Sequence, residues 1–339
     1  MLDVFNSNAF SVVSLTDAVN KIPFVPGRLG QIGLFNESGV TTTTVAIEQK
    51  EGELILVPPT PRGGPGTVID KNKRSLLDIR IPHFEINDAV MAEEVQGIRA
   101  FGEENIVETV MGKVAQRGQT HSQSHSATEE YARVGAVKGV ITYADASTLS
   151  LFTTFGVSQE AEIDFDLHTD GSATGAFRKK CATTIRLIGT QLGGVPWRGV
   201  HALCGDAFYD MLIGNKEVRD TYLNWNAAIE LRAGYATPNQ QSWGAFEFGG
   251  ITWENYRGAV GNTSFVHTDK CHLFPLGAPG LFRTYYAPAD YVETVNTMGR
   301  RLYQKQYEMP NGKGIHLDTQ MNALHICTRP KTLLVGRHT

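Results

Sequence analysis

The sequence predicts an α+β fold in which one long helix lies between two stretches of strands. Three observations predict it: a proline-free stretch at 88–138 with apolar residues at helical spacing, alternating apolar residues before it, and alternating apolar residues again from 315. The 339 residues are 41% apolar and 19% charged, which is the composition of a folded globular protein. This length suffices for two ordinary domains or for one large elaborated domain.

Residues 1–36 predict an N-terminal arm. After a short helical pattern, prolines and glycines prevent regular structure, namely Pro23, Pro26, Gly27, Gly30 and Gly33. Because such a segment buries little of its own surface, an ordered arm needs a partner surface to lie on.

Residues 37–87 predict a long excursion of two strands. Apolar residues alternate with polar ones around Val45 and again around Ile79. Between the two strands lies the sequence PPTPRGGPG at 58–66, which cannot form an interior strand or helix. Because a thin pair of strands is only marginally stable alone, we expect support from outside the monomer.

Residues 88–139 predict one long helix. Asp88 is suited to cap its N-terminus, and Glu93 and Glu94 suit the first turns, next to the positive end of the helix dipole. Apolar side chains recur at helical spacing at 90–114 and again at 131–137, and Gly139 is a residue type that commonly ends helices.

The middle of this helix, at 115–130, loses its apolar face to Gln, Ser and His. Gly112 and Gly118 weaken it further, so this part is expected to be solvated or to lie across a polar neighbour. His121 and His125 have the i, i+4 spacing that a metal would use. The metalloprotease pattern, however, requires glutamate directly after the first histidine, where the sequence has serine. We therefore expect a solvated polar face rather than a metal site.

The remaining residues predict a mixed region of strands and helices. Residues 140–185 contain a strand–turn–strand element and most of a helix at 173–188. Residues 186–290 form a mixed domain. Residues 291–339 contain returning strands around an Asn311-Gly312 hairpin signal.

Charge and apolar run length narrow the class of protein. The net charge is −4, and no block of Lys or Arg indicates a nucleic-acid groove. No window of about eighteen apolar residues predicts a membrane span, and the start lacks the pattern of a secretory signal. The four cysteines are far apart, which predicts free and mostly buried thiols rather than a zinc site or disulfides: Cys181, Cys204, Cys271 and Cys327.

No concentrated catalytic, cofactor or metal site is predicted. The RGGPG run at 62–66 lacks the Lys-Ser/Thr of a phosphate-binding loop, and no helical pattern follows it. Cys271 and His272 would point to opposite faces of a strand, which argues against a catalytic dyad. No GxSxG elbow occurs, nor GxGxxG after a strand. A chain of this size without such a site is more often structural than catalytic.

The order of these parts resembles that of lambda-type major capsid proteins of tailed bacteriophages, and six stretches carry the resemblance in the right order. The likeness extends over nearly the whole chain from Asp3, and VFN at 4–6 resembles the start of the mature proteins, which implies that no large N-terminal scaffolding segment is present. The stretches are TPRGGPG (60–66), VQGIRAFG (95–102), GAVKG (135–139), FGGITWENYRG (248–258), APADYVETVNT (287–297) and CTRP (327–330).

The resemblance implies the Hong-Kong-97-type (HK97-type) capsid fold. Its parts would be the N-arm (1–36), the E-loop (37–87), the spine helix of the P-domain (88–139), the P-domain β-element with the start of the A-domain (140–185), the A-domain (186–290), and a return through the P-domain with the C-terminal strand (291–339).

The same resemblance implies a structural protein without catalytic residues or cofactor. Copies would self-assemble in the cytoplasm of the bacterial host, as hexamers and pentamers, into an icosahedral shell around double-stranded DNA. Partners would be scaffold and portal proteins and a decoration protein, and the slight acidity suits a wall that encloses DNA without gripping it. The tip of the E-loop would contact an adjacent subunit, with Arg62 pairing with a carboxylate. The contact residues expected are Arg62, Gly63, Gly64, Pro65 and Gly66.

Two other functions stay open at this point. An encapsulin-type nanocompartment would share the fold but hold an enzyme cargo and lack portal and tail partners; the lambda-type stretches argue against it. A cytosolic enzyme is the other alternative, because active sites can be assembled from residues far apart in sequence. It would form a monomer or dimer rather than a shell.

Overall fold

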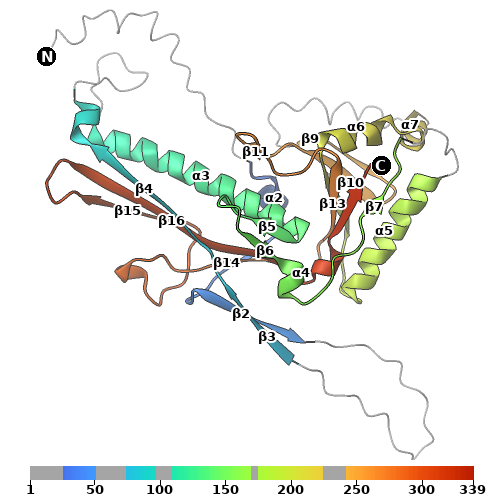
Figure 1. The fold of residues 1–339 in the computed structure, drawn as a ribbon, viewed down its shortest axis with the longest axis horizontal. Coiled ribbons are helices and arrows are strands. Elements are labelled where there is room, and N and C mark those ends of the chain that lie inside the picture. Colours follow the sequence, from blue (N-terminus) through green and yellow to red (C-terminus); the bar gives the residue numbers. More distant parts are fainter. Residues whose placement is uncertain (1–25, 51–73, 97–108, 169–174, 224–241) are drawn as a thin grey trace, which may run out of the picture.

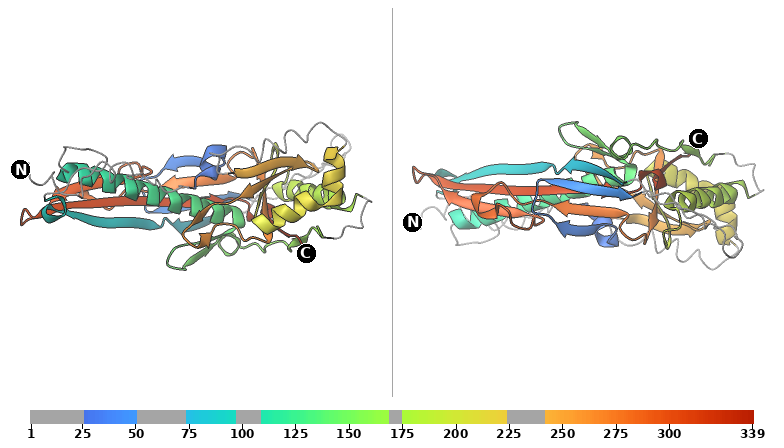
Figure 2. Two further views of the ribbon diagram at one scale, coloured as in Figure 1. Left: turned by 90° about the horizontal axis from the view of Figure 1, so that it is seen from above. Right: turned by 90° about the horizontal axis from the view of Figure 1, so that it is seen from below.

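The computed structural model describes residues 26–50, 74–96, 109–168, 175–223 and 242–339 (Figure 1). The molecule is elongated, with one sheet and a long helix toward one end and a second, helix-flanked sheet toward the other (Figures 1 and 2). Among the described residues, no helix is both long enough and apolar enough to cross a membrane.

The first sheet has five strands, arranged around the long strand β16 (Gly314–Cys327). The others are β1 (Asn36–Gly39), β4 (His83–Met91), β14 (Phe282–Tyr286) and β15 (Tyr303–Glu308). β16 pairs antiparallel with β4 and β15 along its first part and with β14 along its last. Most of β16 is buried, because helix α3 covers one face and the segment after β14 contacts the other.

Helix α3 (Val110–Lys138) runs along β16 (Figure 2). The Thr109 hydroxyl accepts a hydrogen bond from the backbone N–H of Gly112 at 3.0 Å and so caps the N-terminus. The predicted end at Gly139 is confirmed: this residue has the left-handed conformation (φ 82°) that favours glycine. The helix is continuous through Gly112 and Gly118. At Gly118, a Cβ would lie 2.5 Å from the amide nitrogen of Gln304 on β15, so the glycine allows this close approach.

The prediction that the helix begins at Asp88 is wrong. Asp88 lies in β4, which is followed by the 3-10 helix η3 (Ala92–Val95), and the described part of the helix begins at Val110. The alternation of exposed and half-buried residues along most of β4 fits a strand, and the nine residue pairs in register with β16 supply the ladder that stabilises it. Long-range pairing here overrides a local capping signal.

The second sheet has six strands in the order β7-β17-β13-β8-β10-β9. Their bounds are β7 (Ile163–Asp164), β17 (Leu334–Arg337), β13 (Lys270–Leu276), β8 (Gly199–Cys204), β10 (Ile251–Tyr256) and β9 (Ser242–Phe248). Three helices flank it, α5 (Ala176–Leu192), α6 (Asp206–Gly214) and α7 (Lys216–Leu223). The helix predicted at 173–188 thus corresponds to α5, and its buried side chains contribute to the main core.

Shorter elements complete the fold. β2 (Thr44–Lys50) pairs with β3 (Arg74–Arg80), β5 (Val140–Thr142) with β6 (Thr148–Ser150), and β11 (Ala259–Val260) with β12 (Thr263–Ser264). The remaining helices are α2 (Arg28–Ile32), α4 (Leu151–Thr154), η4 (Val292–Thr294) and η5 (Pro330–Thr332). The strand–turn–strand prediction after Gly139 is confirmed by β5 and β6, and the Asn311-Gly312 signal marks the β15–β16 turn.

The arm prediction is tested only at 26–36, since 1–25 lie outside the described residues. The expectation that prolines and glycines prevent regular structure is wrong at α2, which forms one short helix ended by Gly33 in the left-handed conformation (φ 66°). Leu29 of this helix is fully buried, so packing against the body offsets the low helix propensity.

Candidate functional site

The five contact residues predicted at the loop tip, 62–66, lie outside the described residues. The structure describes the two strands that lead to them. Val45 and Ile79 are buried where β2 and β3 leave the body, whereas Leu76 is 70% exposed. Figure 1 shows this hairpin projecting from the rest of the molecule. A two-stranded ribbon with an exposed leucine has little internal support, which is the geometry of an element that packs on another molecule.

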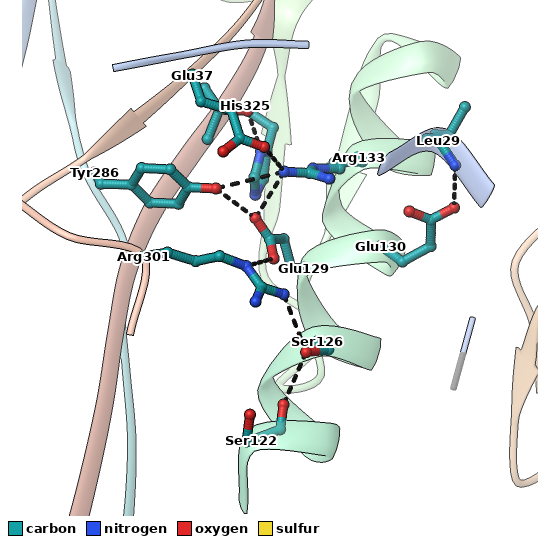
Figure 3. Close-up of polar contacts among 11 residues, drawn as sticks. Leu29, Glu37, Ser122, Ser126, Glu129, Glu130, Arg133, Tyr286, Arg301 and His325 are labelled. Atoms are coloured by element: carbon teal, nitrogen blue, oxygen red, sulfur yellow. Dashed lines mark hydrogen bonds and ion pairs between the residues drawn. The ribbon is translucent and has the colours of Figure 1, made fainter. Parts of the chain in front are cut away.

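The most extensive polar site in the described chain joins α3 to the five-stranded sheet (Figure 3). The Glu129 carboxylate is its centre. One oxygen accepts hydrogen bonds from the Arg133 guanidinium at 2.8 Å and from the Tyr286 hydroxyl at 2.7 Å. The other accepts from Nε of Arg301 at 2.7 Å. Arg133 also donates to Glu37 on β1 at 2.6 Å.

Burial and the neighbouring charges act in opposite directions on the pKa of Glu129. Burial alone would raise the pKa of Glu129, but Arg133 and the Tyr286 hydroxyl outweigh it, so the pKa lies below its usual value. Burial and the contact with the Glu129 carboxylate raise the pKa of the Tyr286 hydroxyl far above its usual range. The network therefore holds a charged carboxylate and a charged guanidinium in a buried site, and it joins α3 to β1, to β14 and to the segment before β15.

A second set of contacts fixes α2 between α3 and β10. The backbone N–H of Leu29 donates to Glu130 at 2.8 Å, and the Tyr256 hydroxyl donates to the same oxygen at 3.2 Å. The Arg28 guanidinium forms a two-point pair with Glu254, at 2.8 and 3.1 Å. Burial raises the pKa of Glu130 despite these donors, whereas His201 and Arg28 hold the pKa of the buried Glu254 low. The segment that follows residues 1–25 is thus anchored to both halves of the molecule.

The expectation of a solvated face at His121 and His125 is wrong. Both side chains are buried against β16: Nδ1 of His121 lies 3.1 Å from the Thr319 hydroxyl, and Nε2 of His125 lies 3.2 Å from the Thr319 carbonyl oxygen. Burial lowers the pKa of His125. The polar middle of the helix therefore lies across a polar neighbour, which was the other possibility left open. Within the described ranges, no group of three or more His, Cys, Asp or Glu side chains could hold a metal ion.

The cysteine prediction is confirmed, since all four thiols are free and buried. Cys271 and His272 are successive residues of β13. Burial raises the pKa of the Cys271 thiol well above its usual value and lowers that of the His272 imidazole to about 3. Both groups are therefore neutral at pH 7, and they do not form a thiolate–imidazolium pair.

Sequence reasoning missed the network around Glu129. One signal was present: Glu129 and Arg133 stand at i, i+4, which favours an ion pair, within a part of the helix where apolar spacing resumes. Their partners Glu37, Tyr286 and Arg301 are spread over the chain without any spacing rule, so no local pattern indicated them.

Comparison with known proteins fits this architecture. The profile of the phage major capsid protein E family matches residues 11–337. The major capsid protein of Pseudomonas phage KPP10 is 25% identical over 348 residues, covering 97% of both chains. That of Salmonella phage Felix O1 (isolate Felix O1-VT1) is 25% identical over 364 residues, covering 98% of both chains.

Solved capsid structures share the fold. The putative capsid protein of a prophage of E. coli CFT073 has a TM-score of 0.55 at 12% identity, covering 98% of this chain and 97% of that one. The mature capsid of bacteriophage PhiM1 gives a TM-score of 0.54 at 11% identity, covering 94% of this chain and 89% of that one. The predicted HK97-type α+β fold is confirmed. With a family profile that spans nearly all of its length, the chain belongs to the phage major capsid protein E family.

Proposed function

We propose that copies of this chain assemble as hexamers and pentamers into the icosahedral shell that encloses the double-stranded DNA genome of a tailed bacteriophage. The observation that carries the proposal is the family match over residues 11–337, which leaves no large part of the chain for another activity. On this proposal the protein is structural and has no catalytic role.

The geometry supports assembly through projecting elements. The β2–β3 hairpin projects from the body and exposes Leu76. In a closed shell, rings form by head-to-tail contacts between unlike surfaces, and a projecting hairpin on one copy needs a receiving surface on the next. The anchored α2 fixes the end of the proposed N-arm on the body, which suits an arm that contacts neighbouring copies.

We assign the parts of the HK97-type fold as the sequence predicts them, with one change. The spine helix is placed at Val110–Lys138, and β4 joins the P-domain sheet. The other proposed parts keep their bounds, although β4 begins within the E-loop and continues beyond it. They are the N-arm (1–36), the E-loop (37–87), the P-domain β-element and start of the A-domain (140–185), the A-domain (186–290) and the return through the P-domain with the C-terminal strand (291–339).

Further partners belong to the same proposal. Scaffold and portal proteins would act during assembly in the cytoplasm of the bacterial host, and a decoration protein would bind the outside. The packaged DNA would lie near the inner wall without specific recognition, in keeping with the net charge of −4.

Arg62 at the E-loop tip is proposed to pair with a carboxylate of an adjacent subunit, alongside Gly63, Gly64, Pro65 and Gly66. Arg62→Glu should lower the particle yield at least tenfold, because it replaces an attraction by a repulsion, and a loss of about 1.4 kcal/mol in a single contact already lowers its association constant tenfold. The far-ultraviolet circular dichroism of the unassembled subunit should be unchanged. Lys71→Glu is the matched control, with the same charge change outside the proline- and glycine-rich stretch. A normal particle yield for Arg62→Glu would contradict the role of Arg62.

The assembly proposal itself is tested by negative-stain electron microscopy of the protein expressed alone and with its neighbouring genes. Closed angular shells with the neighbouring genes, or tubes and partial shells without them, are expected. Closed shells filled with an enzyme cargo would instead favour a nanocompartment. A uniform field of small particles under both conditions would contradict the proposal and favour an enzyme with a dispersed site.

A further inference from the structure

The segment 288–298 connects β14 to β15 and presents apolar side chains to solvent. These are Val292, Val295 and Met298, of which Val292 is 91% exposed. Both ends of the segment are joined to the body by backbone hydrogen bonds, from the N–H of Ala287 at 3.0 Å and from the N–H of Gly299 at 2.9 Å. Between these two points its hydrogen bonds to the five-stranded sheet involve side chains, so the donors and acceptors of these side chains decide how firmly the segment lies there.

Two amide side chains of β16 hold the backbone of this segment. Nδ2 of Asn322 donates to the Pro288 carbonyl at 2.8 Å, and Oε1 of Gln320 accepts from the N–H of Asp290 at 2.9 Å. A backbone carbonyl only accepts and a backbone N–H only donates, so these contacts fix which way each amide is turned. The other end of each amide, Oδ1 of Asn322 and Nε2 of Gln320, therefore faces β4.

His83 of β4 lies between two acceptors. Its Nδ1 is 2.6 Å from Oδ1 of Asn322, and its Nε2 is 3.3 Å from Oε2 of Glu85. Burial alone would raise the pKa of Glu85, but hydrogen bonds from His83 and Asn87 outweigh it, so the pKa is lowered and the carboxylate is charged. Neither oxygen has a proton to donate, so both ring nitrogens must donate. This geometry requires the doubly protonated imidazolium form of His83.

Loss of one proton from His83 breaks one of these two hydrogen bonds. A proton left on Nε2 turns the lone pair of Nδ1 toward the oxygen of Asn322, which holds Pro288. A proton left on Nδ1 turns the lone pair of Nε2 toward Glu85, whose other oxygen accepts from Nε2 of Gln320 at 3.3 Å. In either case, one of the two amides that hold the segment loses support on the β4 side.

The other charged groups around this network either act in the same direction or do not respond near neutral pH. Burial and the Glu85 carboxylate raise the pKa of Asp318, and when Asp318 gives up its proton, a second negative charge repels Glu85. Nζ of Lys305 on β15 donates to both oxygens of Glu293, at 2.7 and 3.0 Å, and lies 5.2 Å from the ring centroid of Tyr291. Lysines and exposed carboxylates do not change charge near neutral pH.

We propose that the doubly protonated form of His83 acts as a latch, which holds the segment 288–298 on the five-stranded sheet and releases it as the pH rises. The latched segment requires a proton that the released segment does not. The latch is therefore strongest below the range in which histidines titrate, and it weakens as the pH rises through that range. It controls how the chain presents the three apolar side chains of the segment.

Spin labelling of the full chain before assembly measures the release. All four native thiols are buried, so Val292→Cys supplies one accessible thiol for a nitroxide. The ratio of mobile to immobile label should rise about tenfold between about pH 5 and about pH 8, because a state that holds one additional proton gains up to about tenfold per pH unit. Partial unfolding in acid would have the opposite sign, with more mobile label at low pH.

Two substitutions in the labelled chain separate His83 from its neighbours. His83→Asn introduces an amide that can donate to Asn322 at every pH, so the label should stay immobile and the ratio should change by less than about twofold. Asp318→Asn removes the second titrating group and should keep most of the response. His316→Asn is the matched control: the ring of His316 lies against Tyr307, with centroids 5.0 Å apart, and this variant should respond like the unsubstituted labelled chain.

A flat response of the labelled chain, or a rise in mobility toward low pH, would overturn the inference. A full response in His83→Asn would overturn it as well. A response that disappears in Asp318→Asn but persists in His83→Asn would assign the proton to Asp318 and not to His83. None of these results depends on whether shells form, so the proposed function is tested separately.

Discussion

The two sheets are held together by different chemistry. In the six-stranded sheet, buried rings pack around Trp253: Phe165 at a centroid distance of 5.5 Å, Phe177 at 5.8 Å and Phe208 at 5.9 Å. In the five-stranded sheet, α3 is attached through Glu129, its two arginines, Tyr286, and the two histidines on Thr319.

The difference has a mechanical consequence. Apolar packing is not directional, so it stabilises a compact unit without fixing one register between elements. Charged hydrogen bonds are directional and, when buried, leave a costly unpaired group if one partner is removed. The six-stranded sheet is therefore tolerant of conservative changes in its apolar core, whereas the position of α3 on β16 depends on a few specific side chains.

The largest effect is expected in the apolar region. Trp253→Ala should lower the free energy of unfolding by about 4 kcal/mol, because it leaves a cavity among the rings and removes the hydrogen bond from its indole to the Phe248 carbonyl. Urea denaturation of the unassembled subunit measures this loss. Trp253→Phe keeps most of the ring volume and should therefore lose clearly less free energy of unfolding than Trp253→Ala. A loss below about 1 kcal/mol for Trp253→Ala would show that this core does not carry the stability assigned to it.

In the polar region, Glu129→Ala should lower the free energy of unfolding by about 3 kcal/mol, because Arg133 would be left buried with only Glu37 as a carboxylate partner. The double variant Glu129→Met with Arg133→Met should be less destabilised than Glu129→Ala alone, because no buried charge is left unpaired. Glu37 and Arg301 lose their partners, but their side chains are about half exposed to solvent. If the double variant loses more free energy of unfolding than Glu129→Ala in the same urea titration, the buried charge does not explain the loss in the single variant.

Acid should weaken both regions, because each contains a buried histidine whose pKa is far below its usual value. The pKa of His325 on β16 and of His272 on β13 is lowered from 6.5 to about 3, in both cases chiefly by burial. The unfolded chain therefore binds protons first as the pH falls. Stability is greatest above pH 6.5 and decreases toward pH 3 by about 1.4 kcal/mol per pH unit for each histidine. Unfolding titrations from pH 7 to pH 4 should show a shallower slope for His325→Gln and for His272→Gln. If either variant shows the same slope as the wild type, the histidine that it replaces does not contribute to the loss of stability in acid.

The smallest effect concerns the start of α3. Thr109→Ala removes the acceptor for the Gly112 N–H and should lower the free energy of unfolding by about 1 kcal/mol. Thr109→Ser keeps the hydroxyl and should be nearly neutral. Hydrogen exchange of the first turn of α3 measures the local effect, and equal exchange in the two variants would contradict the capping role.

Local patterns predicted the parts of the fold that local chemistry decides. The end of α3 at Gly139 follows from the need for a left-handed residue, and the β15–β16 turn follows from Asn311-Gly312. The start of the helix was not predictable in this way. Asp88 with Glu93 and Glu94 has the composition of a helix start, but β4 gains its hydrogen bonds from β16, more than two hundred residues later.

The polar site was predictable only in outline. The sequence indicated that the middle of α3 is polar, but not which neighbour it contacts. Thr319, Tyr286 and Arg301 come to α3 through the pairing of β16 with β14 and β15, which is a property of the whole sheet.

The central claim is that this chain builds a closed shell from many copies of itself. Cryo-electron microscopy of particles made by expression with the neighbouring genes tests it most directly. The account predicts an icosahedral shell of hexamers and pentamers, with α3 continuous from Val110 to Lys138 and the β2–β3 hairpin of each copy lying over an adjacent one. Particles of monomer or dimer size, without closed shells under any condition, would contradict it.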